Sequence, residues 1–397
     1  MHNIPYFIGK VPQEMEGRRI SPSKIKAVVV SCDMTTPYGQ GTDACWNSIL
    51  SGKSAVSRLN RFNAKAFQSE YAATINGLKY HQKDSLVIQM LQSLFNKPSV
   101  LIPEDAKLIL ATTKGEIDLL EKMILEGKGN MSDCGLGSLL KKVSTLTGVK
   151  DAGIIISAAC ASSSAALARA AAIIRSRYSD CVLVIACDSI TEFVFSGFSS
   201  LMALDKSAAK PFDKNRSGLS LGEAAAFALI MSDSRARQEK RKIIGEIAGW
   251  GLSDDANHMT GPSRTSEGLI LAIKKAFKTA DIDKKDIGFI AAHGTGTVYN
   301  DAMEIKAFHT VFKNIKIPVY SIKGAIGHTM GAAGLVEMII ALRSLKERKI
   351  PPTVNLRTAD EDAREWVSSC ERPVGKNKTA LVTNAGFGGI NAALVLR

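Results

Sequence analysis

The feature that most constrains the fold is a repeat: both halves of the 397-residue chain show the same order of sequence patterns. Each half has an opening strand-like run, a short apolar strand that ends in a polar loop, a helix of small residues and closing apolar strands. The paired segments are 24–32 and 242–250, 107–115 and 286–297, and 153–174 and 319–345, with closing strands at 181–189 and 222–231 and at 379–387 and 391–397. A repeat of this size is a duplicated subdomain and not a short solenoid period.

We therefore expect two similar α/β subdomains, separated by the polar, basic stretch 231–242. The boundaries would give an N-terminal extension at 1–23, a first half at 24–235 and a second half at 236–397. The helices that follow Cys160 and His328 are rich in Ala and Gly and have no polar face. A helix of this kind is buried on all sides, so both helices should lie at the centre of the molecule.

The charge balance favours an acidic partner. The chain has 51 Lys and Arg against 38 Asp and Glu, a formal net charge of +13, which steers anionic partners without specifying them. Nucleic acid and a small acidic carrier protein are both candidates, and a basic surface with no partner is a third reading. No helix-turn-helix, RNP or zinc-finger pattern is present, which argues against nucleic acid.

Cysteine spacing and hydropathy exclude other classes. The seven cysteines form no CxxC pair and are irregularly spaced, so we expect neither a disulfide framework nor a metal site. No apolar stretch reaches the ~18–20 residues that span a bilayer, and the first 24 residues lack the apolar segment of a signal peptide. We expect a cytoplasmic protein without membrane insertion.

Cys160 lies where an apolar run meets a run of small residues. Residues 153–157 predict a buried strand and 161–176 a helix, which places the cysteine at a strand-to-helix turn. Free N–H groups and the helix dipole at such a turn lower the pKa of a thiol, and small neighbours admit a substrate. The pattern predicts a nucleophile. The alternative, a buried structural cysteine, suits Cys181 and Cys187 inside their apolar strand.

Two histidines follow comparable patterns in the second half. His293 ends an apolar strand and enters a Gly/Thr loop, where α/β folds place their sites. Asp301 and Glu304, early in the next helix, are expected to cap or position that loop. His328 precedes a small-residue helix as Cys160 does. A structural histidine at a strand end is the alternative for His293.

The remaining candidates lie in Gly-rich loops. Lys323, five residues before His328, is expected to bind a carboxylate or to stabilise an oxyanion; otherwise it is a solvated lysine. Three glycines surround Phe387 in a turn whose backbone N–H groups would complete an oxyanion hole, unless the turn is a plain hairpin. No GxxxxGK[ST] or strand-bound GxGxxG motif is present, so this is not a nucleotide loop.

Together these segments resemble the condensing enzymes of the thiolase fold, and more narrowly the elongating β-ketoacyl-[acyl carrier protein] synthases. The matching segments are SAACASSSAAL, AHGTGTVYNDAMEI, SIKGAIGHTMGAAGLVE, NAGFGGINAALV and KPFDKNRSGLSLGEAAAFALI. The resemblance runs from about residue 24 to residue 397. It implies an α/β thiolase-like fold in five layers, αβαβα.

The resemblance also implies a Cys–His–His site. Cys160 would accept an acyl chain from the phosphopantetheine arm of a carrier protein as a thioester. The backbone N–H groups of Cys160 and Phe387 would hold the oxyanion, and His293 and His328 would stabilise the enolate left when malonyl-carrier loses CO2. In supporting roles, Lys323 would pair with Glu337 and hold the histidine region, Thr295 and Thr297 would line the pantetheine path, and Phe387 would gate access.

Such enzymes need no metal or organic cofactor, and the basic surface would dock an acyl carrier protein. The resemblance further implies a homodimer, or a heterodimer with a chain-length-factor-like paralogue. The C-terminal loop has no second cysteine, which separates the chain from degradative thiolases. The histidine pair separates it from initiating synthases, which use Cys, His and Asn. The presence of Cys160 separates it from chain-length factors.

The sequence departs from housekeeping fatty-acid synthases around the expected acyl pocket. The region 60–105 looks shorter, and Thr113 and Lys114 replace small apolar residues. Lys114 would shorten the pocket or reach a partner subunit, unless it is a surface lysine; Phe198 is a third pocket candidate. Fatty acid, polyene and polyketide synthesis therefore stay open as pathways. A non-catalytic or partner-dependent subunit and a nucleic-acid-binding protein are the alternatives from other classes.

Overall fold

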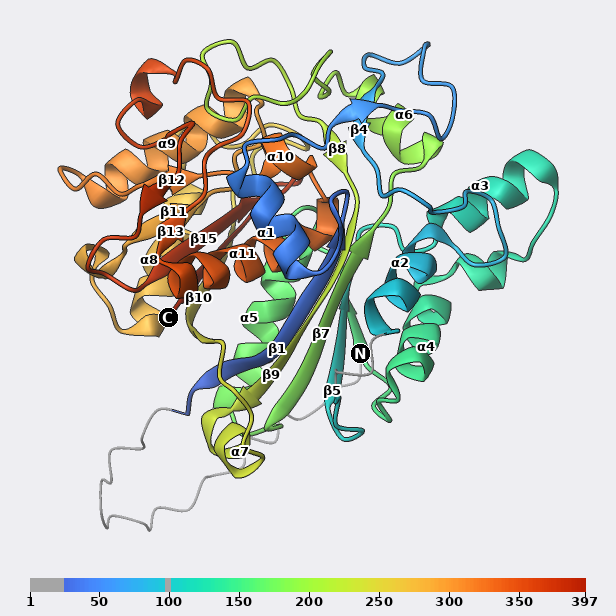
Figure 1. Ribbon diagram of the computed structural model, residues 1–397, viewed down its shortest axis with the longest axis horizontal. Coiled ribbons are helices and arrows are strands. Elements are labelled where there is room, and N and C mark those ends of the chain that lie inside the picture. Colours follow the sequence, from blue (N-terminus) through green and yellow to red (C-terminus); the bar gives the residue numbers. More distant parts are fainter. Residues whose placement is uncertain (1–24, 97–100) are drawn as a thin grey trace, which may run out of the picture.

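The computed structural model describes residues 25–96 and 101–397 (Figure 1). The N-terminal extension expected at 1–23 lies outside these residues. The first half contributes β1 (Ala27–Thr36), β2 (Gly39–Gln40), β5 (Lys107–Ala111), β6 (Ile154–Ile156), β7 (Cys181–Asp188) and β9 (Ala224–Ser232) to the main sheet. The second half contributes β10 (Gly245–Asp254), β11 (Phe289–Ala291), β12 (Val319–Tyr320), β15 (Ala380–Ala385) and β16 (Ile390–Leu396).

The strand order confirms the predicted duplication. The first set runs β1-β9-β7-β5-β6 and the second runs β10-β16-β15-β11-β12. In both sets the first two pairings are antiparallel and the last two are parallel. The sets meet where β1 pairs with β10 at Val28 and Val29. Apart from β2, which pairs with β1 beside this order, each half is therefore the same five-strand unit.

Helices cover both faces of the two sets and complete five layers (Figure 1). The central helices are α5 (Ser162–Arg175) and α11 (Ala333–Glu347), whose side chains share one buried cluster with strands of both halves. A second cluster joins the first set of strands to α2 (Leu86–Phe95) and α4 (Leu136–Thr147). A third joins the second set to α8 (Glu267–Ala280) and α9 (Val298–Phe312). The expected αβαβα arrangement is confirmed.

Small residues allow the central helices to pack closely. A Cβ atom on Gly334 of α11 would lie 2.0 Å from Ser164 Oγ of α5. Both helices are almost wholly buried, as their lack of a polar face predicts. Because these two helices begin just after Cys160 and His328, their close packing brings the two loops together.

The remaining elements surround the loop ends of the strands or connect the layers. The helices are α1 (Thr42–Leu50), α3 (Ile117–Glu126), α6 (Glu192–Ser200), α7 (Asp233–Gln238) and α10 (Lys323–Ile326). Short 3₁₀ turns are η1 (Met131–Cys134), η2 (Lys284–Asp286), η3 (Met330–Ala332) and η4 (Glu361–Ala363). Two small sheets consist of β3 (Ser57–Arg58), β4 (Tyr71–Ala73) and β8 (Leu221–Gly222), and of β13 (Lys349–Ile350) and β14 (Arg372–Pro373).

The strand before Cys160 differs from its prediction. The run 153–157 was expected to be a buried strand, but β6 is the last strand of the sheet order and Ile154 is 44% exposed. An apolar run does not by itself distinguish a central strand from an edge strand. Separately, no helix in the described part of the chain is long and apolar enough to cross a bilayer.

Candidate active site

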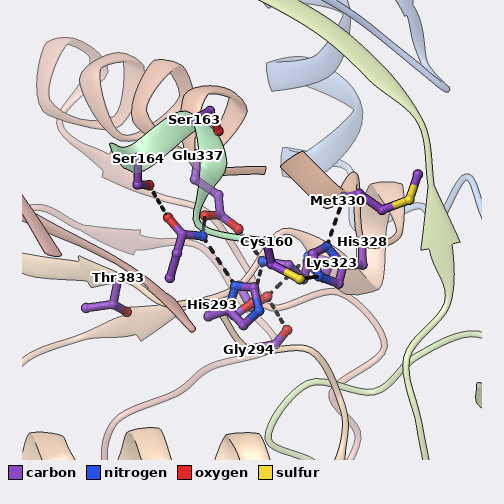
Figure 2. A network of polar contacts seen from close by, with 12 residues as sticks. Cys160, Ser163, Ser164, His293, Gly294, Lys323, His328, Met330, Glu337 and Thr383 are labelled. Atoms are coloured by element: carbon purple, nitrogen blue, oxygen red, sulfur yellow. Dashed lines mark hydrogen bonds and ion pairs between the residues drawn. The ribbon is translucent and has the colours of Figure 1, made fainter. Parts of the chain in front are cut away.

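Cys160, His293 and His328 come together in one buried site (Figure 2). His328 Nε2 lies 3.0 Å from Cys160 Sγ, and the two imidazole rings are 5.1 Å apart between centroids and nearly perpendicular. The sulfur and one nitrogen of each ring all lie within 4.8 Å of one another. Cys160 is 6% exposed and each histidine 1%. Three residues from loops in both halves therefore face a common point.

Cys160 occupies a tight turn between β6 and α5. The preceding residue, Ala159, has a φ of 46°, a left-handed conformation that is strained for a residue with a side chain. Ser162 holds the turn, since its Oγ accepts from Ala158 N at 2.8 Å and donates to Ala159 O at 2.6 Å. The turn therefore directs the sulfur into the site.

The C-terminal loop approaches the same sulfur. A Cβ on Gly386 would lie 3.2 Å from Cys160 N, so a glycine at this position lets the loop lie against the nucleophile. The backbone N–H of Phe387 favours the thiolate and so lowers the pKa of this thiol, against the larger effect of burial. The loop that contains Phe387 thus lies against the turn that contains Cys160, and the oxyanion hole expected from their backbone N–H groups stays a prediction.

The expected lowering of the Cys160 pKa is not found. Burial is the largest effect and raises the pKa of the thiol above its ordinary value, although the Phe387 N–H and the charge on Lys323 lower it. Desolvation of the charged form therefore outweighs the groups that favour the thiolate. The resting side chain is a thiol, and its surroundings stabilise the thiolate only in part.

Hydrogen bonds fix the proton position on His328. Burial, followed by the charge on Lys323, holds the pKa of this histidine well below its ordinary value, so the ring is neutral. The backbone N–H of Met330 donates to His328 Nδ1 at 3.2 Å. A neutral imidazole that accepts at Nδ1 has its proton on Nε2. Nε2–H therefore points at Cys160 Sγ as a donor and does not act as the acceptor of the thiol proton.

Lys323 lies next to the histidine loop and is 1% exposed, so the alternative of a solvated lysine is wrong. Its Nζ donates to the backbone oxygen of His293 at 2.6 Å and forms an ion pair with Glu337. The pair that the resemblance implies is thus present. These contacts join the His293 loop to α10 and α11, so Lys323 is placed to hold His293 in position.

Asp301 and Glu304 of α9 bind the backbone of the histidine loop. Glu304 accepts from His293 N at 2.8 Å and from Gly294 N at 2.6 Å. Asp301 accepts from Gly296 N at 3.2 Å and from Phe212 N at 2.7 Å. Burial raises the pKa of both carboxyl groups, that of Glu304 to about 7. Both residues hold the loop, as their sequence positions suggest.

A cavity of about 340 Å³ contains the sulfur and both imidazoles in its lining. Among the residues predicted from the sequence, Thr295, Thr297, Phe198 and Phe387 also line it. The Phe198 and Phe387 rings are 5.8 Å apart between centroids. The lining also includes exposed residues such as Met202 and Tyr299, so the cavity reaches from the surface to Cys160.

Thr113 and Lys114 do not line this cavity. Thr113 donates from both N and Oγ1 to the buried carboxylate of Asp188, at 3.0 and 2.9 Å. Lys114 Nζ lies 3.2 Å from Thr113 Oγ1 and 5.9 Å from the centroid of the Phe198 ring. Their roles in an acyl pocket stay predictions.

The structure adds residues that sequence reasoning missed. Asn384 of β15 contacts His293 and Glu337. Asp188, which binds Thr113, also accepts from the backbone N–H of Gly331 in η3 at 2.7 Å. Asp255 and His258, after β10, line the cavity. Asp188 and Asn384 are polar residues at the ends of apolar strands, and this pattern could have marked them as site residues in the sequence.

Comparison with known proteins identifies the family. The profile described as "Beta-ketoacyl synthase, N-terminal domain" matches residues 139–236, and that described as "Beta-ketoacyl synthase, C-terminal domain" matches residues 244–357. Together they span more than half of the chain. The protein belongs to the β-ketoacyl synthase family of condensing enzymes, which are acyltransferases.

Relatives and solved structures extend the match to most of the chain. The 3-oxoacyl-[acyl-carrier-protein] synthase 2 of Vibrio cholerae is 28% identical, over 94% of this chain and 99% of the relative. The actinorhodin polyketide putative beta-ketoacyl synthase 1 of Streptomyces coelicolor is 27% identical, over 94% and 89%. A solved type II polyketide ketosynthase, in complex with its acyl-carrier protein and bound to the hexaketide, superposes with a TM-score of 0.86 at 26% identity, covering 94% of this chain and all of that one.

Proposed function

We propose that this protein catalyses the decarboxylative Claisen condensation of malonyl-[acyl carrier protein] with an acyl chain held as a thioester on Cys160. The observation that carries the proposal is the placement of one thiol and two neutral imidazoles on a single buried cavity. No metal or organic cofactor has a part in it. The substrates arrive on the phosphopantetheine arm of the carrier.

The first half-reaction transfers the acyl group. Cys160 Sγ attacks the thioester carbonyl of the acyl-carrier, and the backbone N–H groups of Cys160 and Phe387 stabilise the oxyanion. The C–S bond to pantetheine then breaks, and the proton released by Cys160 ends on the pantetheine thiol. The Phe387 N–H lowers the pKa of the Cys160 thiol and so offsets part of the effect of burial, which favours this attack.

The second half-reaction forms the new carbon–carbon bond. Malonyl-carrier loses CO2, and the electron pair of the broken C–C bond moves into its thioester carbonyl as an enolate. Nε2–H of His328 and Nε2–H of His293 would donate to that oxygen. The enolate carbon attacks the acyl-Cys160 carbonyl, the Cys160 thiolate leaves and takes up a proton, and the β-ketoacyl product stays on the carrier.

The carrier protein is proposed to dock at the mouth of the cavity. The related ketosynthase structure contains an acyl-carrier protein, and this chain has a net charge of +13. Lys206 and Arg264 are exposed and lie close in the chain to Ala203 and Pro262, which line the cavity. They are the basic residues that we assign to the docking of an acidic carrier.

The chain is proposed to work as a dimer in the cytoplasm, extending a fatty acyl, polyene or polyketide chain. A homodimer and a heterodimer with a chain-length-factor-like paralogue both fit, since the ishigamide ketosynthase/chain length factor shares the fold at a TM-score of 0.85. The edge strand β6, with Ile154 half-exposed, is the proposed subunit contact. A non-catalytic subunit is disfavoured because Cys160 and both histidines are present and assembled.

Intact-protein mass spectrometry tests this function. Wild type and Cys160→Ala are incubated with acyl-carriers of graded chain length, and malonyl-carrier is then added. We expect an acyl mass on wild type alone, followed by release of a β-ketoacyl-carrier that is two carbons longer. Acylation that needs a co-expressed paralogue would indicate the heterodimer. If wild type takes up no acyl group with any carrier, with or without that paralogue, the proposal fails.

A further inference from the structure

A buried amide on β15 contacts one of the two histidines directly. Asn384 is fully buried, and its side chain has three polar partners. Its Oδ1 accepts from Ser164 Oγ, and its Nδ2 donates to Glu337 Oε2 at 2.6 Å and lies 3.3 Å from His293 Nδ1. Figure 2 labels the three partners, Ser164, Glu337 and His293. The amide therefore joins α5, α11 and the histidine loop.

The orientation of this amide is set by chemistry. The Glu337 carboxylate is paired with the Lys323 ammonium and only accepts hydrogen bonds, so the NH2 end of Asn384 must face it. The oxygen end then faces the Ser164 hydroxyl, which donates. An NH2 group has two hydrogens. One of these hydrogens is donated to Glu337, and the second points toward His293 Nδ1.

We infer that Asn384 is a positioning residue that fixes the tautomer of His293, with Nδ1 as acceptor and the proton on Nε2, facing the cavity. The inference rests on the proposed function for its catalytic meaning. Burial and the charge on Lys323 keep this imidazole neutral, so it has one proton to place. The backbone of His293 is held separately, by Glu304 at N and by Lys323 at O.

The two histidines thus hold the same neutral tautomer, with the proton on Nε2, through different hydrogen-bond donors. His328 Nδ1 accepts from a backbone N–H, that of Met330, which no side-chain substitution removes. His293 depends on a side chain. With its proton on Nδ1, His293 would present a lone pair to the developing enolate oxygen and one of two donors would be lost. Loss of one such donor typically costs about 10²–10³-fold in rate.

Because the His293 tautomer depends on Asn384, a change at Asn384 should affect the two half-reactions differently. Acyl transfer uses Cys160 and the backbone N–H of Phe387, whereas decarboxylation uses Nε2–H of both histidines. We therefore expect Asn384→Ala to leave acylation of Cys160 within about 2-fold and to slow CO2 release from malonyl-carrier by about 10-fold or more. Ser164→Ala is the matched control, because it removes the other hydrogen bond of the same amide and keeps its donor to His293. Its decarboxylation rate should fall less.

A spectroscopic measurement tests the tautomer without turnover. Long-range ¹H–¹⁵N correlation of ¹⁵N-histidine-labelled protein distinguishes protonated from unprotonated ring nitrogens, and His293→Gln assigns the His293 signals. We expect Nε2–H in wild type and a population with Nδ1–H in Asn384→Ala. If thermal unfolding shows that the alanine variant does not fold, Asn384→Ser replaces it.

Two results would overturn the inference: Nδ1–H on His293 in wild type, or an equal loss of both half-reactions in a folded Asn384 variant. A wild type that neither acylates nor decarboxylates would instead contradict the proposed function, and the wild-type spectrum would still decide the tautomer.

Discussion

At the scale of single residues, the site places ionisable groups in surroundings that keep them neutral. Burial raises the pKa of the Cys160 thiol and lowers the pKa of both histidines. A neutral thiol and two neutral imidazoles avoid the cost of burying isolated charges. The Lys323–Glu337 pair is the charged element, and its positive charge further disfavours protonation of the rings. Neutral Nε2–H groups are what the proposed enolate needs.

Glu304 gives a pH-dependent prediction. Burial raises the pKa of this carboxyl from 4.5 to about 7, so the folded state favours the protonated form. The difference between the folded and unfolded pKa of Glu304 stabilises the folded state. This stabilisation is fully present below pH 4.5 and is lost as the pH rises through 7. Relative to Glu304→Gln, the free energy of unfolding of wild type should fall by about 3 kcal/mol between pH 4.5 and pH 8. Urea unfolding of both proteins across this range measures the difference. A pH-independent difference would contradict it.

At the scale of secondary-structure elements, the close contact of α5 and α11 connects stability to the site. A Cβ on Gly334 would lie 2.0 Å from Ser164 Oγ and 2.8 Å from Asn384 Oδ1. Gly334→Ala should therefore separate the helices, cost about 1–3 kcal/mol of stability and slow decarboxylation by moving the Asn384 amide. Denaturant unfolding and CO2 release measure the two effects.

The control for this change is Gly137→Ala. Gly137 also lies in a helix, α4, but a Cβ there meets nothing within 4 Å. Alanine in an open helix position is expected to stabilise by up to about 1 kcal/mol. If Gly334→Ala unfolds at the same denaturant concentration as wild type, or is as stable as Gly137→Ala, the close packing of α5 and α11 does not limit stability.

How far the sequence predicts the structure also differs between elements. The duplicated strand order and the central helices follow from hydrophobic patterns and small residues, and the loops with Cys160, His293 and His328 follow from their strand-to-helix positions. The exposure of β6 does not follow, because an apolar run has the same pattern at an edge and in the middle of a sheet. The roles of Asn384 and Asp188 depend on contacts between residues far apart in sequence, such as Ser164 with Asn384, which one sequence does not reveal.

At the scale of the whole molecule, β6 leaves one end of the sheet open in the described chain. Ile154 is 44% exposed, and Tyr178, which lines the same surface cavity as Ile154, is 75% exposed. Exposed apolar edge strands are sites of pairing with another chain. Ile154→Lys should therefore weaken the proposed dimer, as measured by sedimentation velocity over a range of concentrations. Leu271→Lys, on the outer helix α8 with Leu271 46% exposed, is the control and should leave the dimer intact. A dimer of unchanged affinity in Ile154→Lys would place the interface elsewhere.

The basic surface of the molecule gives a last prediction, on carrier recognition. If Lys206 and Arg264 attract an acidic carrier, Lys206→Glu and Arg264→Glu should raise the KM for malonyl-carrier several-fold and leave turnover of a small malonyl thioester unchanged. Added salt should narrow the difference between variant and wild type, because exposed charges are screened over about 10 Å at 0.1 M ionic strength. Lys141→Glu makes the same charge change on the outer helix α4, where Lys141 is exposed. Equal KM increases in all three variants would mean that net charge, and not the cavity mouth, governs docking.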